Sequence, residues 1–461
     1  MSSRLLSSAF ASFGALALIG AASSAQAFCG FYVAKADTDL FNQSSKVAMM
    51  RDGDRTVITM ANDYQGEPEE FAMVIPVPEV ITREQVHISD PALLEHLDAY
   101  TAPRLVEYFD NDPCTPPPMP MVMMDGAVAE SGAMLQRRTA RAKALGVTIE
   151  DQFTAGEYDI LILSAKESEG LQTWLAGEGY KVPREARRTL SSYIKQDMKF
   201  FVAKVNLEER AKSGNEFLRP IAVAFETPKF MLPIRLGTVN AKDDQDLFVY
   251  MLTRSGQVET TNYRTQKIPT GQELPTFVKD EFGDFYTSMF TTAADKEGGH
   301  GVFMEYAWDM NWCDPCAADP LSVAQLQELG VFWLDDPVKA PRGRTRFAPQ
   351  QARDVFVTRL HVRYDADSFP EDLKFKTTGN RDNFQGRYVL RHAYDGEMQC
   401  EMATDYKKQV NERREEEIKT LAKLTRWERS DIRDKVEDTT GFFDIKAKSD
   451  VKWWNRIWKD D

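Results

Sequence analysis

The sequence lacks long apolar runs beyond its first 27 positions, and it lacks an excess of positive charge. No later segment reaches the roughly 18 uninterrupted apolar residues that a membrane-spanning helix needs. The 461 residues include 57 Lys and Arg against 71 Asp and Glu, which gives a formal net charge of −14. Because phosphate groups are neutralised by a basic surface, this balance argues against nucleic acid as a partner. The composition, with 43% apolar and 28% charged residues, is that of a globular protein.

Motifs of common enzymes are also missing. The chain has no Gly-x-Ser-x-Gly elbow, no His-Glu-x-x-His and no Walker loop. Residues 365–370 begin like a calcium loop, but Pro370 stands where that loop requires glycine. The five histidines are scattered along the chain. The sequence therefore favours a non-enzymatic protein, and we expect neither a cofactor nor a metal site.

The first 27 residues have the pattern of a secretory signal. Arg4 supplies the positive charge, residues 9–19 form a short apolar stretch, and Ala25-Gln26-Ala27 has the small-x-small form that signal peptidase cleaves. We expect cleavage after Ala27. The prediction is an exported protein, either periplasmic or secreted.

Five cysteines are few for this length, and their number is odd. All are disulfide candidates, since exported thiols are usually oxidised: Cys29, Cys114, Cys313, Cys316 and Cys400. Five thiols allow two bridges and one unpaired residue. If Cys313 and Cys316 close on each other, the other three compete for a single bridge.

Trp312-Cys313-Asp314-Pro315-Cys316 is the sharpest chemical motif. It is similar to a thioredoxin-type redox site, in which a helix start lowers the pKa of the first thiol. Asp314 departs from that pattern, because its charge would raise the pKa of a neighbouring thiol. A structural disulfide is the simpler interpretation. A zinc site is a third alternative, with the additional ligands His300, His392 or Cys400.

Apolar runs of strand length recur along the chain, at residues 55–60, 71–77, 158–163, 199–207, 221–226, 231–239, 247–253, 301–308, 355–365 and 383–394. The first two flank a turn-rich segment and predict a hairpin. Helical spacing marks residues 91–100, 167–179, 184–195 and 322–329, and a long amphipathic helix over 401–438. We predict an α+β fold with a mostly antiparallel, strand-rich core, flanking helices and a long C-terminal amphipathic helix. Residues 71–76 and 230–234 look alike, but the likeness is too short to indicate duplication.

The predicted organisation has a signal peptide at 1–27 and a mixed α/β region at 28–290. A strand-rich region with the cysteine pair follows at 291–400, then a helix and aromatic tail at 401–461. The tail carries Trp453, Trp454 and Trp458, which could contact the envelope or a membrane surface. Alternatively, the tail could fold back and cover the edge of a core.

Two predicted strands carry arginines on one face. Alternation places Arg359 and Arg363 together on the first strand, with His361 between them, and places Arg387 and Arg391 together on the second. Guanidinium groups aligned in this way could bind a carboxylate or phosphate. The alternative is that they pair with acidic residues 412–417 of the C-terminal helix.

Several motifs together resemble a bacterial exported family, domain of unknown function family 2330. They include Cys29-Gly30-Phe31-Tyr32, the strand 71–78 that ends in Pro-Val-Pro, and Leu232-Pro233-Ile234-Arg235-Leu236. The resemblance covers residues 28–270 and extends toward 400. It implies export and a mixed, strand-rich fold, but no known reaction, substrate or active site. The family often has a second cysteine soon after the first, which this chain lacks, so Cys29 needs a distant partner or stays free.

These observations favour an exported protein with a non-enzymatic binding or envelope-associated role. The competing hypothesis is a thiol-disulfide oxidoreductase that uses Cys313 and Cys316. The sequence does not identify a ligand or partner.

Overall fold

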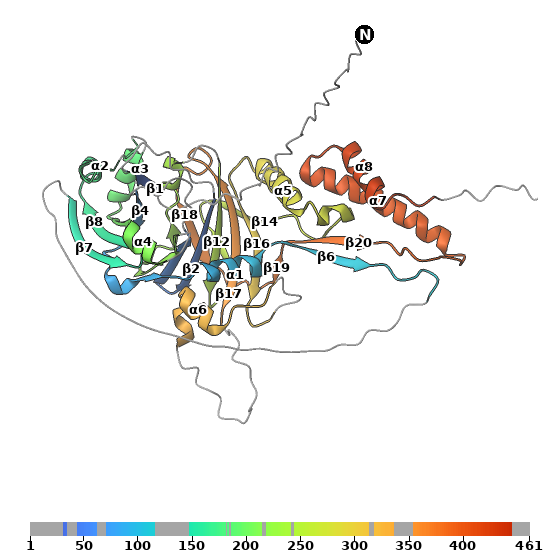
Figure 1. Cartoon of the computed structure of the whole chain (residues 1–461), viewed down its shortest axis with the longest axis horizontal. Helices are drawn as coiled ribbons and strands as arrows, with labels where there is room; N and C mark the ends of the chain where they lie inside the picture. The colour runs from blue at the N-terminus through green and yellow to red at the C-terminus, as the bar shows by residue number, and fades with distance from the viewer. Residues whose placement is uncertain are drawn as a thin grey trace, which may run out of the picture.

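Figure 1 shows the computed structural model, which describes residues 31–34, 44–61, 71–115, 147–180, 182–183, 186–213, 218–240, 244–312, 318–335 and 354–444. The strands are β1 Phe31–Ala34, β2 Ser44–Asp52, β3 Arg55–Ala61, β4 Phe71–Val77, β5 Val86–Ile88, β6 Arg104–Phe109, β7 Val147–Ala155, β8 Tyr158–Ala165, β9 Lys199–Val205, β10 Ile221–Glu226, β11 Met231–Leu232, β12 Gln245–Thr253, β13 Val258–Thr260, β14 Arg264–Lys267, β15 Gln272–Leu274, β16 Gly301–Asp309, β17 Phe356–Tyr364, β18 Leu373–Thr377, β19 Phe384–Gln385 and β20 Arg387–His392. The α-helices are α1 Pro91–Thr101, α2 Ser168–Gly177, α3 Ala186–Ile194, α4 Leu207–Ser213, α5 Phe282–Lys296, α6 Val323–Leu329, α7 Ala403–Thr425 and α8 Arg429–Thr439. Short 3-10 turns are η1 Arg83–Gln85, η2 Gly237–Asn240, η3 Thr276–Lys279 and η4 Phe332–Asp335.

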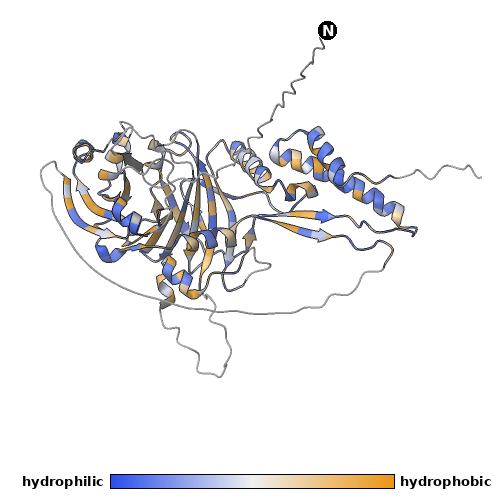
Figure 2. Cartoon of the chain, in the orientation of Figure 1, coloured by the Kyte–Doolittle hydropathy of each residue, from blue (hydrophilic) through white to orange (hydrophobic). Residues whose placement is uncertain are grey.

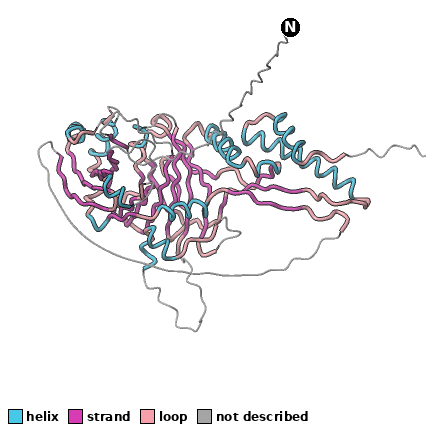
Figure 3. The backbone as a smooth tube through the Cα atoms, in the orientation of Figure 1, coloured by secondary structure: helices cyan, strands magenta, loops and turns pink. Residues whose placement is uncertain are grey.

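Two large sheets form the body of the molecule. A nine-stranded sheet runs in the order β14-β16-β17-β12-β2-β3-β10-β5, with β19 also paired to β16, and a five-stranded sheet runs β1-β4-β9-β8-β7. Most neighbours are antiparallel, although β12 and β2 pair in parallel, as do β14 and β16. The tube in Figure 3 shows the strands concentrated here, with helices around them. The predicted α+β fold with a mostly antiparallel core is confirmed.

The predicted hairpin of residues 55–60 and 71–77 is wrong. β3 pairs with β2 and β10, whereas β4 lies in the other sheet between β1 and β9. The hairpin partner of β3 is β2, which is joined to it by a two-residue turn. Gly53 in this turn has φ 60°, a left-handed conformation that favours glycine.

Because successive side chains of a strand point to opposite faces, each strand of the two large sheets can pack into two different buried clusters. In β4, Ala72 and Val74 pack in the buried cluster of α2 and α3, while Met73 and Ile75 join the cluster that also contains residues of β3 and β10. Successive strand residues point to opposite faces, so one strand serves both clusters. The five-stranded sheet therefore has helices α2 and α3 on one face and the nine-stranded sheet on the other.

The nine-stranded sheet is also covered on both faces. Val47 and Met49 of β2 belong to the cluster between the two sheets, while Ala48 and Met50 pack in a second cluster with α1 and α6. Strands buried on both faces read as nearly continuous apolar runs, as β12 Gln245–Thr253 does. In β2 the apolar run spans only residues 47–50, and this strand was not predicted from the sequence. Figure 2 shows these apolar strands in the centre of the molecule.

A smaller unit lies beside this body. β6 and β20 pair in parallel, with β15 on the other side of β20, and they extend from the body beneath α7 and α8 in Figure 1. A disulfide joins Cys114 to Cys400, with the two Cα atoms 5.6 Å apart. It links the segment after β6 to the segment before α7.

The apolar pattern of residues 401–438 forms two helices rather than one. α7 ends at Thr425, and Arg426 adopts the left-handed conformation with φ 63° before α8 begins. Thr425 Oγ1 accepts a hydrogen bond from the Trp427 N–H at 3.1 Å, and Trp427 Nε1 donates to Ser288 Oγ of α5 at 3.0 Å. The turn is therefore held against α5, and the helix reverses there.

Candidate functional site

A buried charged network is built on the arginine-bearing face of β17. Phe356, Leu360 and Val362 pack in the cluster between the sheets, so Arg359 and His361 point to the opposite face. Both are almost completely buried. The expected alternation is therefore present, but this face of the strand is covered and not open to solvent.

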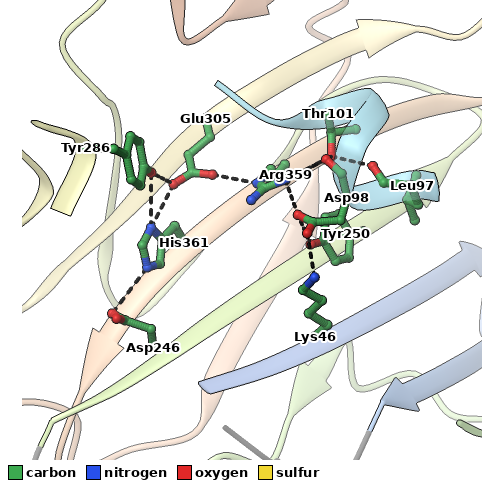
Figure 4. Close-up of polar contacts among 10 residues, drawn as sticks. All are labelled: Lys46, Leu97, Asp98, Thr101, Asp246, Tyr250, Tyr286, Glu305, Arg359 and His361. Atoms are coloured by element: carbon green, nitrogen blue, oxygen red, sulfur yellow. Dashed lines mark hydrogen bonds and ion pairs between the residues drawn. The ribbon is translucent and has the colours of Figure 1, made fainter. Parts of the chain in front are cut away.

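Glu305 of β16 stands at the centre of the network (Figure 4). Its Oε2 accepts a hydrogen bond from Arg359 Nε at 2.5 Å, and its Oε1 lies 2.7 Å from His361 Nδ1. The Tyr286 hydroxyl of α5 also donates to Oε1. On the far side of the imidazole, His361 Nε2 lies 3.2 Å from Asp246 Oδ1.

α1 closes the other end of the network. The helix begins at Pro91, where Asp90 Oδ1 caps the Ala92 N–H at 2.9 Å. It carries Asp98 to within 2.6 Å of Arg359 Nη1, and Asp98 also accepts from the Tyr250 hydroxyl at 2.8 Å. Lys46 of β2 pairs with the same carboxylate.

The charges of this network stabilise one another. Burial alone would raise the pKa of Glu305, but Arg359 and His361 outweigh it, so that pKa lies below its ordinary value. Burial alone would lower the pKa of His361, but Glu305 and Asp246 raise it above its ordinary value. For Asp98, Arg359 and Lys46 outweigh burial and lower the pKa to about 2. The network therefore fastens α1 and α5 to the sheet.

Four arginines were predicted to line an anion-binding strip, and the structure places them in two different sheets. Arg359 and Arg363 lie on β17 of the nine-stranded sheet, and Arg387 and Arg391 lie on β20 beside β6 and β15. A single strip therefore does not form.

The acidic partners also differ from the predicted ones. Arg363 pairs with Asp246 at 2.8 Å, and Arg391 Nη2 pairs with Glu273 at 2.8 Å, so neither uses residues 412–417 as its principal partner. Within the described part of the chain, Arg387 forms no ion pair. The alternation that places the arginines on one face of each strand was predicted correctly. Their expected partners on the C-terminal helix were not, because the carboxylates come from β12, β15, β16 and α1.

A polar pocket of about 400 Å³ lies between β20, α7 and α8. Arg391 and His392 at the end of β20 line one side, and Arg413, Arg414 and Glu417 of α7 line another. The remaining walls come from residues 275–277, 393–395 and 436–443.

Two charged side chains of this pocket each have a buried atom that forms no hydrogen bond. Arg414 and Glu417 are 8% and 5% exposed, yet Arg414 Nη1 and Glu417 Oε1 form no hydrogen bond. Arg413 Nε is the nearest cation to Glu417 Oε1, at 3.6 Å, while Arg413 Nη2 donates to Asp110 at 2.9 Å. Buried polar groups are nearly always hydrogen-bonded, so this pair is unusual.

The pKa values of the pair reflect that environment. Burial raises the pKa of Glu417 to about 7, and the opposing effect of Arg413 is smaller. Burial also lowers the pKa of Arg414 below its ordinary value. Near neutral pH the pocket therefore contains a guanidinium and a carboxyl group that can donate or accept a proton.

The cysteines are only partly placed. Cys114 and Cys400 bond to each other, so Cys400 is not a zinc ligand with the motif cysteines. Cys29, Cys313 and Cys316 lie outside the described residues. In the parts of the chain that the structure describes, no group of three His, Cys, Asp or Glu side chains could hold a metal ion. Likewise, no helix there is both long and apolar enough to cross a membrane.

A family model described as an uncharacterized protein conserved in bacteria (DUF2330) matches residues 23–376, more than three quarters of the sequence. The chain belongs to this family. No curated protein and no solved structure matches it. The DUF2330 match covers the five-stranded sheet, the nine-stranded sheet except β19, and the buried network. It ends before β20, α7 and α8, and 12 of the 15 residues that line the polar pocket lie beyond it.

Among the residues that line the pocket, the sequence indicated Arg391 as an anion ligand, His392 as a zinc ligand, and Glu417 only as one of the acidic residues 412–417. The burial of Arg414 and Glu417 was missed, although a signal for it exists. They follow Val410 by four and seven positions, on the same helical face as Ile418 and Leu421. A charged residue inside the apolar stripe of a helix marks a buried charge, and such charges need a partner.

Proposed function

We propose that this DUF2330 member is an exported, non-enzymatic binding protein that holds a small carboxylate-bearing solute in the polar pocket. The observation that carries the proposal is the buried pair Arg414 and Glu417, whose Nη1 and Oε1 atoms lack hydrogen-bond partners. Leaving such groups unsatisfied is costly, and a ligand that pairs with both recovers that cost.

The chemistry of the pocket selects the ligand class. Arg391 and Arg413 are already engaged by Glu273 and Asp110, which leaves Arg414 to receive an anion. A protonated Glu417 donates a hydrogen bond to the same ligand. A pocket of about 400 Å³ is at the small end of ligand sites and fits a solute of about sugar size. The Thr439 and Thr440 hydroxyls donate to the Lys435 and Val436 carbonyls, so toward a ligand they act as acceptors for its hydroxyl groups.

Calorimetric titration with D-glucuronate tests this proposal, and D-glucose serves as the neutral counterpart. We expect the wild type to bind glucuronate but not glucose. Arg414→Gln should weaken glucuronate binding about tenfold or more, because it removes a charge-assisted hydrogen bond, which is stronger than a neutral one. Arg429→Gln removes the same charge from an exposed position on α8 and should have no effect. Equal binding of the Arg414 variant would contradict the proposal.

Glu417 adds a pH dependence to this binding. Its carboxyl donates a hydrogen bond when protonated and repels an anion when ionised, so affinity should fall as pH rises through about 7. Glu417→Gln keeps the shape and cannot ionise, so its affinity should be flat across that range. The pH values 5.5 and 8.5 lie about one and a half units below and above the pKa of Glu417. If the affinity of the wild type is the same at both, Glu417 has no role in binding.

A thiol-disulfide oxidoreductase is the competing proposal. Trp312 beside the motif is 51% exposed, and the Cys114–Cys400 bond removes two of the possible partners of Cys313 and Cys316. Reduction of insulin by the purified protein, abolished by Cys313→Ala, would support it. No reduction by the wild type would eliminate it.

Contact with the envelope through Trp453, Trp454 and Trp458 stays a prediction, because the tail lies outside the described residues. Deleting residues 445–461 and fractionating the cells tests it. An unchanged distribution of the truncated protein would reject the membrane contact.

A further inference from the structure

An apolar cavity of about 150 Å³ lies at the junction of the two large sheets. β3 and β10 of the nine-stranded sheet supply Met60, Val223 and Phe225, and β4 of the five-stranded sheet supplies Ile75 and Val77. Apolar cavities of this size stay dry and accept apolar guests in other proteins. Filling the space restores dispersion contacts that its lining otherwise lacks.

Two similar sequence segments meet at this cavity. Ile75 and Pro76 come from residues 71–76, and Met231, Leu232 and Pro233 come from residues 230–234. Their shared pattern of apolar residues followed by proline therefore forms two parts of one wall. Both segments lie within the DUF2330 match, unlike most of the polar pocket.

The charge at the cavity is positive. Lys229 is exposed and is the single charged residue in the lining, and no carboxylate in the described ranges pairs with it. The other polar contributors are Gln196 and Thr227. A guest with an apolar body and a negative head group complements both the lining and this lysine.

We propose that the cavity binds an anionic amphiphile, with the end of its acyl chain between the sheets and its head group at Lys229. This site is separate from the polar pocket between β20, α7 and α8, and neither proposal depends on the other. The chemistry required is a single chain of modest length that ends in a carboxylate.

Titration of the purified protein with hexanoate, octanoate and decanoate tests whether the acyl chain enters the cavity. Each buried methylene should tighten binding about fourfold until the cavity is full, after which affinity should level off. Val223→Phe narrows the cavity and should weaken the longer chains most. Affinity that is independent of chain length, or no binding of any of the three, would overturn the proposal.

Lys229→Gln tests the head-group contact without touching the core. It should weaken octanoate binding about two- to fivefold, as expected for an exposed ion pair, and leave 1-octanol binding unchanged. Lys229→Arg should bind like the wild type. Lys296→Gln removes an exposed lysine at the end of α5 and should change nothing. Equal losses for octanoate and octanol in the Lys229→Gln variant would refute the head-group assignment.

Discussion

Replacing Glu417 by glutamine should stabilise the protein at alkaline pH and change the shape of its stability profile. The pKa of this carboxyl is about 7 in the folded chain against 4.5 for the ordinary group. Each pKa unit corresponds to about 1.4 kcal/mol, so ionising Glu417 in its buried position costs about 3 kcal/mol. Below pH 4.5 the group is protonated in both states, and the cost is absent.

The sign of the effect follows from proton binding. Between pH 4.5 and 7 the folded chain keeps a proton on Glu417 that the unfolded chain has lost, so stability falls as pH rises. Above about pH 7 both states are ionised, and the loss is complete. Glutamine cannot ionise, so Glu417→Gln should equal the wild type near pH 4 and exceed it by about 3 kcal/mol at pH 8.

Urea unfolding followed by tryptophan fluorescence at several pH values measures this difference. Glu416→Gln is the matched control, because Glu416 is the exposed neighbour on α7 and its ion pair with Lys419 is at the surface. A wild-type profile parallel to that of Glu417→Gln between pH 4 and 8 would refute the reasoning. His361 has a raised pKa as well, but it is present in both proteins and cancels in the comparison.

Three further predictions concern the fold. Glu305→Gln should lower the free energy of unfolding by about 3–5 kcal/mol, because it removes the carboxylate that pairs with both Arg359 and His361 and leaves buried Arg359 with Asp98 alone; a change below about 1 kcal/mol in urea unfolding would contradict this. Asp98→Asn should remove about 2 kcal/mol of stability that the wild type has above pH 3.8 and loses as pH falls toward 2, which acid titration of the circular dichroism signal would detect. Cys114→Ser should lower stability by about 3 kcal/mol, and a reductant should then affect the variant less than the wild type; equal sensitivity would contradict a closed Cys114–Cys400 bond.

Elements with a strong local pattern could be predicted from the sequence. The helix at residues 91–100 became α1, with its cap at Asp90 and its proline at the first turn. The strand at residues 355–365 became β17, with its apolar and arginine-bearing faces as expected. Both depend on neighbours within a few positions, where periodicity and capping are informative.

Pairings between distant strands could not be predicted in the same way. β3 and β4 are adjacent in sequence but lie in different sheets, and β12 pairs with β2 about 200 residues away. Such pairings depend on which faces pack together across the whole molecule, and alternation within one strand does not specify a partner. The partners of Arg359 and Arg363 were missed for this reason, since Glu305 and Asp246 reach them from neighbouring strands.

The two proposed sites differ in whether they lie within the region that the DUF2330 family model matches. Every residue that lines the apolar cavity precedes position 376, so a relative that contains only the matched region has the chain segments for it. The polar pocket instead combines residues 275–277, inside the match, with Arg414 and Glu417 beyond it. Residues 275–277 supply no cation for an anionic ligand, because the pocket's arginines lie on β20 and α7, both beyond the match. Binding of an amphiphile is therefore the activity that the matched region itself could provide, and binding of a small carboxylate requires the C-terminal strand and helices.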